Sequence, residues 1–372
     1  MTQQKGTSES DEDAEEGVLD LSTEEDEEAP REIRYTITSY GADPLVDGLV
    51  KRLQEGDIYI PAFQRSYVWK KPQASRFVES LLLGLPVPGL FLAKDPGSAK
   101  QLVVDGQQRL QSLRMFYEGL FKDTDESKGE EFTLTGVQSK YLGKTYKSLE
   151  KDDRRTLDNA IIHATIVRQD SPEGDDSSIY QIFERLNTGG TLLHPQEIRA
   201  CVSHGPLNEL LGKLNRVDAW RRIYGPVSRR MKDRELILRF FTMKFSLESY
   251  KRPMKEALNK YMAKNRNLSL QPAELLEGVF KDTIEAVYAA LGQEAFKPTK
   301  ALNAAVFDSV MVGVSKRLDA GSRPSAKSLK KSYLDLLADG SFQLAYQKST
   351  ADEKQVQTRL QVATEYFAKC TS

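Results

Sequence analysis

The spacing of hydrophobic positions changes near residue 200. Before that point, short apolar runs such as Leu90–Ala93 and Gln101–Val104 predict strands between helical patterns. After Pro195, apolar positions recur at helical spacing in one segment after another. We therefore expect an α+β protein, with a small mixed-sheet domain over residues 31–200 and an α-helical domain over residues 201–372. The predicted helices span residues 45–55, 72–84, 110–117, 179–186, 206–214, 234–246, 273–291, 301–318, 325–337 and 352–369.

Local signals predict further features of the first domain. Asp43 followed by Pro44 is typical of a helix start, with a side-chain cap and proline in the first turn. Residues 160–167 predict a buried strand, in which His163 is expected to be a satisfied core side chain. Residues 120–158 are polar and mixed, which indicates an insertion.

Charge is divided unevenly along the chain. Residues 1–29 hold twelve acids and a single base, Lys5, so the total of −1 leaves +10 for the other 343 residues. A segment this acidic and this poor in apolar residues predicts a disordered tail over residues 1–30. We interpret it as a solubilising tail or, alternatively, as an intramolecular mimic of nucleic acid that competes for the basic body.

Cysteine spacing and hydropathy argue against several classes of protein. Cys201 and Cys370 are far apart and form no CxxC pair, so neither a disulfide framework nor a cysteine zinc site is supported. No apolar run approaches membrane-spanning length, and no signal segment opens the chain. We expect a cytoplasmic protein that does not bind membranes.

The run Asp105-Gly106-Gln107-Gln108-Arg109 joins a strand-like segment to a helix-like one. A strand, a glycine turn and a helix start present backbone N–H groups and a partial positive charge, which suit an anion such as a phosphate. Asp105 would orient Arg109, or hold a cation or a water. The alternative is a helix start capped by Asp105, which accounts for the aspartate and the glycine but not for two glutamines and an arginine.

A second run, Phe63-Gln64-Arg65, is followed by Tyr67 and Trp69. Arginine offers a planar fork of donors for phosphate oxygens, glutamine offers an amide, and the aromatic rings offer a stacking face. A structural aromatic corner, with Arg65 paired to a carboxylate, explains the same residues equally well.

A third run, Phe183–Gly190, combines an acid, an amide and two glycines. Glu184 and Asn187 are three residues apart, so on a helix they share a face and their oxygens suit a hard cation such as Mg²⁺. Ordinary helix termination at Asn187 and the following glycines is the alternative, and taken alone it is favoured.

Together the three runs resemble the N-terminal domain family of GmrSD-type restriction endonucleases, a ParB/sulfiredoxin-like nucleotide-binding module of phage defence. The resemblance covers about residues 40–240. The segments that carry it are Ile60–Trp69, Ser80–Pro88, Asp105–Arg109 and Phe183–Gly190.

The resemblance implies a pocket that binds, and often hydrolyses, a nucleoside triphosphate with Mg²⁺ and thereby controls an effector acting on phage DNA. Glu184 and Asn187 are expected to hold the metal, and Asp105, Arg109 and Glu184 to act in catalysis. The residues expected to bind the nucleotide are Gln64, Arg65, Gly106, Gln107, Gln108, Arg109 and Asn187.

Relatives often carry a C-terminal nuclease with a histidine-rich metal centre. Here the three histidines, His163, His194 and His204, all precede residue 205, so cleavage of DNA is expected to need a separate nuclease or effector partner. A second hypothesis is a non-catalytic nucleic-acid-binding or assembly module, and homo-oligomers are compatible with both. A stand-alone nuclease is a third, for which no PD-(D/E)xK-like strand set can be placed.

Residues 213–266 form a basic stretch, with sixteen Lys or Arg against five Asp or Glu. The functional interpretation is a surface for the phosphates of DNA or RNA; the alternative is solvated helix faces whose bases pair with neighbouring acids. A local excess of +11 favours nucleic acid. The residues expected to form this patch are Arg221, Arg222, Arg229 and Arg230.

Overall fold

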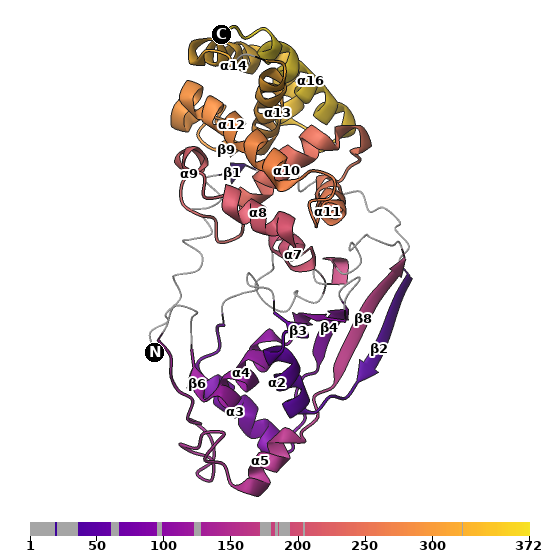
Figure 1. Ribbon diagram of the computed structural model, residues 1–372, viewed down its shortest axis with the longest axis vertical. Coiled ribbons are helices and arrows are strands. Elements are labelled where there is room, and N and C mark those ends of the chain that lie inside the picture. Colours follow the sequence, from indigo (N-terminus) through magenta and orange to yellow (C-terminus); the bar gives the residue numbers. More distant parts are fainter. Residues whose placement is uncertain are drawn as a thin grey trace. The chain divides into compact units, whose positions relative to one another are not determined.

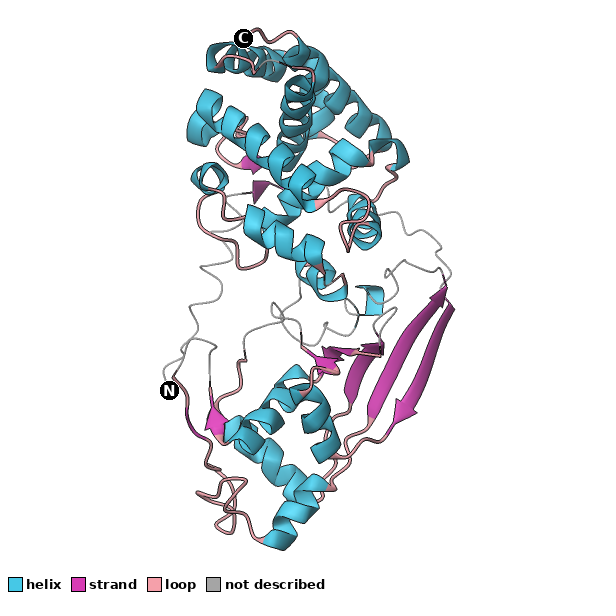
Figure 2. Cartoon of the chain, in the orientation of Figure 1, coloured by secondary structure: helices cyan, strands magenta, loops and turns pink. Residues whose placement is uncertain are grey.

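The computed structural model describes the chain over residues 19–20, 36–60, 67–94, 99–122, 128–171, 180–182, 185, 194–203, 205–321 and 323–372. The chain forms two compact units, which we call the α/β unit and the helical unit (Figure 1). The α/β unit comprises Arg34–Leu193 and Ala200–Val202, and the helical unit comprises His194–Arg199, Ser203–Ser372 and the start of the chain. The predicted α+β fold is confirmed, because a mixed sheet with helices is joined to a region built almost entirely of helices (Figure 2).

A five-stranded sheet organises the α/β unit. Its strand order is β2 (Thr36–Ala42), β8 (Ala164–Ser171), β4 (Leu90–Lys94), β5 (Gln101–Asp105) and β3 (Ile58–Tyr59). The pairs β2/β8 and β4/β5 are antiparallel, whereas β8/β4 and β5/β3 are parallel. Strands β2, β3 and β5 therefore end on the side of the sheet where β4 and β8 begin. We call this side the site edge.

Helices pack on one face of the sheet because their apolar residues recur at helical spacing. Strand residues Leu92, Val103 and Ile166 share one buried cluster with Phe77 and Phe116 from the helices. The helices that contribute to this cluster are α2 (Val46–Gln54), α3 (Lys71–Leu82), α4 (Gln107–Glu118) and α5 (Lys151–Asp158).

Two expectations for this unit are corrected by the structure. Residues 120–158 are not a peripheral insertion, since Phe132, Leu134 and Leu157 are fully buried in the same core. This segment also carries two short antiparallel strands, β6 (Leu120–Phe121) and β7 (Glu130–Glu131). Asp43 does not cap a helix: α2 begins at Val46, its cap position is Leu45, and the side-chain oxygen that accepts from a first-turn N–H is that of Asp47.

The helical unit is built around two buried helices. These are α10 (Lys232–Phe245), in which every residue from Glu235 to Met243 is buried, and α13 (Ala304–Asp319), which is buried from Ala304 to Ser315. The surrounding helices are α7 (Pro195–Val202), α8 (Pro206–Leu214), α9 (Asp218–Tyr224), α11 (Met254–Lys264), α12 (Ala273–Leu291), α14 (Ala326–Ala338), α15 (Gly340–Gln347) and α16 (Glu353–Ala368). Short 3₁₀ turns, η3 (Leu247–Ser249) and η4 (Gly292–Glu294), complete the connections.

Buried charges hold the two central helices together. Arg239 on α10 donates two hydrogen bonds to Asp308 on α13, at 3.2 and 2.6 Å. Arg359 from α16 approaches the same carboxylate at 3.5 Å, and all three side chains are at most 1% exposed. Removing one member of such a cluster leaves a buried charge without compensation, so the cluster ties these helices firmly to each other.

A second buried network surrounds the start of α7. Arg199 donates to the carboxylate of Glu235 at 2.8 Å and to the side-chain oxygen of Asn259 at 2.7 Å. Burial raises the pKa of the Glu235 carboxyl, but the charges of Arg199 and His194 more than offset this and lower it to about 2. His194 caps α7, and burial lowers the pKa of its imidazole.

The start of the chain contributes one short strand. β1 (Leu19–Asp20) pairs in parallel with β9 (Leu302–Asn303), which directly precedes α13. The rest of the acidic tail predicted over residues 1–30 lies outside the described residues. Within the described ranges, no helix has both the length and the apolar character needed to cross a membrane.

Candidate functional site

The turn from β5 into α4 lies on the site edge and depends on Gly106. Its φ of 102° is in the left-handed region, and a Cβ there would lie 2.3 Å from a methyl group of Leu90. The chain therefore turns tightly, and α4 begins at Gln107, directly after the strand. The first-turn N–H groups of a helix have no partners within it, so this turn points donors and a partial positive charge towards the site edge.

Arg109 joins the starts and ends of neighbouring strands. Its guanidinium donates to the carbonyl oxygen of Gly89, just before β4, and to the carboxylate of Asp105, at the end of β5, at 2.6 Å each. The side chain of Arg109 is only 11% exposed, whereas that of Asp105 is 58% exposed. Asp105 therefore orients Arg109, and it makes no side-chain cap to α4.

Gln108 holds the segment that follows the Phe-Gln-Arg run. Its side-chain oxygen accepts hydrogen bonds from the backbone N–H groups of Val68 and Trp69, at 3.0 and 3.2 Å. One residue earlier, the Tyr67 hydroxyl bonds to Ser112 of α4 at 2.7 Å. Burial raises the pKa of Tyr67 to about 12, so it remains a neutral hydroxyl in this contact.

The described residues Tyr67–Trp69, which follow the Phe-Gln-Arg run, thus contact the first turns of α4. Gln64 and Arg65 themselves lie outside the described residues. Glu184 and Asn187 also lie outside the described residues, and between them Arg185 is helical and exposed. The described ranges contain no group of three or more His, Cys, Asp or Glu side chains that could hold a metal.

Comparison with protein families identifies the module. Residues 46–202 match the model of the GmrSD restriction endonuclease N-terminal domain. This segment belongs to that family. The GmrSD domain runs from the first residue of α2 to the last residue of α7, includes all three runs, and implies a role in restriction-type phage defence. No curated protein matches the chain.

Sequence reasoning missed a pair of side chains on the same edge of the sheet as the Asp105–Arg109 run, which we call the GmrSD motif. His163, expected in the core, is 61% exposed, and its Nδ1 lies 2.8 Å from the carboxylate of Asp43. The two residues are 120 positions apart, so only the antiparallel pairing of β2 with β8 brings them together. The sequence offered no signal for this pair, because His163 lay within the strand predicted over residues 160–167 and Asp43 was assigned to a helix start.

The four arginines expected to form a basic patch differ in their exposure and in their partners. Arg221 is 18% exposed and donates to the fully buried Asp233 at 2.9 Å, so it belongs to the internal framework. Arg222 is 56% exposed and pairs with Asp218, which is itself exposed. Arg230 lies 3.4 Å from Glu197, and Arg229 is exposed.

Acidic residues from outside residues 213–266 also pair with bases of this basic stretch. The charge count over residues 213–266 did not include them. Lys213 pairs with Glu277 at 2.8 Å, and Lys244 pairs with Asp319 at 2.6 Å. Part of the apparent excess of positive charge is therefore neutralised by α12 and α13.

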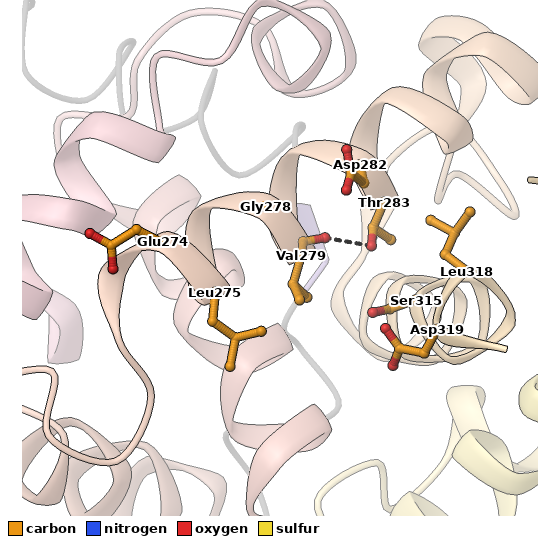
Figure 3. A pocket seen from close by; sticks show the side chains of 9 residues that line it. All are labelled: Glu274, Leu275, Gly278, Val279, Asp282, Thr283, Ser315, Leu318 and Asp319. Atoms are coloured by element: carbon orange, nitrogen blue, oxygen red, sulfur yellow. Dashed lines mark hydrogen bonds between the residues drawn. The ribbon is translucent and has the colours of Figure 1, made fainter. Parts of the chain in front are cut away.

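A pocket of about 280 Å³ lies in the helical unit and not at the GmrSD motif. Its walls come from α12 and α13, and Figure 3 shows carboxylates of Glu274, Asp282 and Asp319 around apolar side chains. Thr283 donates its hydroxyl to the carbonyl of Val279 within the same helix. An acidic rim of this kind does not suit a triphosphate.

Proposed function

We propose that the GmrSD domain binds and hydrolyses a nucleoside triphosphate with Mg²⁺, and that the protein acts as a sensor or regulator in phage defence, coupled to nucleic-acid binding. The main support is the pair of bonds from Gln108 to the backbone of Val68 and Trp69. Through them, Gln108 of the Asp105–Arg109 run holds the segment that follows the Phe-Gln-Arg run. We expect donors for a polyphosphate to come from both runs.

The chemistry of this edge suits an anion. The helix start at Gln107 supplies backbone N–H groups, and the exposed carboxylate of Asp105 is available to orient a water. Glu184 and Asn187 carry the oxygen ligands that Mg²⁺ prefers, and a bound Mg²⁺ would neutralise charge that develops on the phosphates. Hydrolysis at such a site relies mainly on positioning and charge stabilisation.

Nucleotide binding can be tested by the stability it confers. We expect one of ATP, GTP, CTP or UTP with Mg²⁺ to stabilise the α/β unit by about 2.7 kcal/mol at a hundred times its dissociation constant, since the ligand binds only the folded form. Gln107→Ala and Asp105→Asn should reduce this shift and the release of phosphate. Arg114→Ala changes the same helix at a side chain that is 41% exposed, and serves as the matched control. Wild-type protein that neither binds nor hydrolyses any of the four would overturn the proposal.

Nucleic-acid coupling rests on the exposed members of the basic stretch. Arg222 and Arg229 are exposed, and an exposed ion pair such as Arg222–Asp218 contributes little stability, so a phosphate can replace the acid. Replacing either arginine by alanine should weaken DNA or RNA binding and lower the salt dependence by about one unit of slope. Arg221→Ala is the control, because it should reduce stability without this change in slope.

A non-catalytic module is the second candidate, and the geometry of Arg109 favours it. The guanidinium is already bonded to a carbonyl and a carboxylate, so in this conformation it is a structural clamp. Measurable binding of a nucleotide without release of phosphate, under every metal tested, would select this alternative. A separate effector would then sense the bound state alone.

A further inference from the structure

The pair formed by Asp43 and His163 has a defined geometry on the site edge. Asp43 follows the last residue of β2, and His163 precedes the first residue of β8. Nδ1 of His163 lies 2.8 Å from Oδ1 of Asp43, and the two side chains are 61% and 65% exposed. When a carboxylate accepts the Nδ1 proton, it fixes the tautomer in which Nε2 carries a lone pair.

Two glycines shape the space around this imidazole. A Cβ on Gly41 would lie 3.0 Å from Cε1 and 3.6 Å from Nε2 of His163, so the ring lies directly over the bare backbone of β2. A Cβ on Gly89 would lie 2.8 Å from the His163 carbonyl oxygen. A side chain at position 41 would therefore overlap with the imidazole ring, so the glycine at this position allows the ring to lie where it does.

The same backbone connects His163 to the GmrSD motif. The N–H of Leu90 donates to the carbonyl oxygen of His163 at 2.8 Å, and the carbonyl oxygen of Gly89 accepts from Arg109 at 2.6 Å. From β8 across β4 to β5 is two strand spacings, about 10 Å. A triphosphate bound at the start of α4 would have to extend over about this distance along the site edge for its terminal phosphate to meet the imidazole.

We propose that His163 is the general base for triphosphate hydrolysis and that Asp43 is its positioning residue; this rests on the function proposed above. Nε2 of His163 takes a proton from a water as the water oxygen bonds to the terminal phosphorus. The bond from that phosphorus to the bridging oxygen breaks, and the electron pair leaves with the nucleoside diphosphate. The imidazolium then returns its proton to solvent, so the products are the diphosphate and inorganic phosphate.

Steady-state phosphate release separates this role from a structural one. His163→Gln should lower kcat by about 10²-fold and leave KM within about threefold, because general bases contribute to the chemical step.

Gly41→Ala provides a second variant that keeps the histidine. The new methyl group displaces a side-chain ring and no backbone, so the fold should persist while kcat falls by about tenfold. Asp43→Asn should lower kcat by a similar factor, since the amide no longer fixes the Nδ1 proton. Asp170→Asn, at the other end of β8, is the matched carboxylate control and should retain the wild-type kcat.

Imidazole NMR supplies a readout that does not depend on turnover. The chain has three histidines, so the signal of His163 is assigned by its absence in His163→Gln. A non-hydrolysable triphosphate with Mg²⁺ should shift this signal and leave that of His194 in place. If wild type releases phosphate and His163→Gln does so at the same rate, or if the His163 signal does not move, the role of His163 is refuted while the proposed function stands. Wild-type protein without any nucleotide binding refutes both.

Discussion

Replacing Arg109 by alanine should destabilise the α/β unit before any effect on chemistry is considered. The guanidinium makes two charge-assisted hydrogen bonds of 2.6 Å from an environment where it is 11% exposed. The bond to the neutral carbonyl of Gly89 is worth about 1.5–3 kcal/mol, as for hydrogen bonds to charged groups. The partner Asp105 is exposed, so that pair adds at most about 1 kcal/mol. We expect a loss of about 1.5–4 kcal/mol in the free energy of unfolding.

The two tryptophans make this loss measurable for each unit separately. Trp69 lies in the α/β unit and Trp220 in the helical unit, and the chain has no others. In a Trp220→Phe background, urea unfolding followed by fluorescence reports on the α/β unit through Trp69. In a Trp69→Phe background, the same experiment reports on the helical unit, where Arg109→Ala should have no effect.

Arg114→Ala is again the control, since Arg114 is a half-exposed arginine on the same helix and should cost less than about 0.5 kcal/mol. The reasoning is refuted if Arg109→Ala costs no more than this control. It is refuted equally if the loss appears in the unit that Trp220 reports. Loss of phosphate release in Arg109→Ala is evidence for catalysis only after this stability change has been subtracted.

Three further changes test other parts of the structure. The pKa of Glu235 is lowered to about 2 in the folded protein, so its contribution to stability is present above pH 4.5 and is lost as the pH falls towards 2. Glu235→Gln should remove this pH dependence of stability, measured by urea unfolding with Trp220 fluorescence. Asp308→Ala should cost about 3–5 kcal/mol in the same assay, against less than about 1 kcal/mol for the exposed Asp319→Ala, and equal losses would contradict the buried cluster. Gly106→Ala should cost about 2 kcal/mol or more through its left-handed φ and the clash with a leucine methyl, and unchanged thermal unfolding would show that the turn tolerates a side chain.

Helices and strands whose ends are marked by local sequence patterns could be predicted from the sequence. The ends predicted for residues 206–214 and 273–291 agree with those of α8 and α12, because apolar spacing and flanking prolines mark them. The last predicted helix, residues 352–369, differs from α16 only by its caps, Asp352 and Lys369. Strands β4 and β5 were likewise predicted from short apolar runs between turns.

Features that depend on contacts between distant segments could not be predicted. A helix cap was the local interpretation of Asp43, but its partner His163 comes from another strand. The basic stretch was counted against neighbouring acids, whereas Asp308 and Asp319 reach it from α13. Pairing of this kind depends on how distant segments pack together, and a short window of sequence carries no information on that packing.

The candidate site falls between these cases. The Asp105–Arg109 run was predicted as a strand, a glycine turn and a helix start, and the structure confirms that arrangement. The part played by Gln108, which binds the backbone of another segment, could not be inferred, because a glutamine carries no signal for its partner. The roles of Gln64, Arg65, Glu184 and Asn187 stay predictions.

The first turns of α7 set a rule for dissecting or exchanging the GmrSD domain. The family match extends to Val202, yet Arg199 has its bonds with Glu235 and Asn259, which lie well beyond that point. A fragment cut after Val202 would carry an arginine evolved for burial into water, together with apolar neighbours that have lost their cover. A fusion of this domain to a new C-terminal region must therefore also supply acceptors for the Arg199 guanidinium. This requirement limits the positions at which evolution or an engineer can join such proteins.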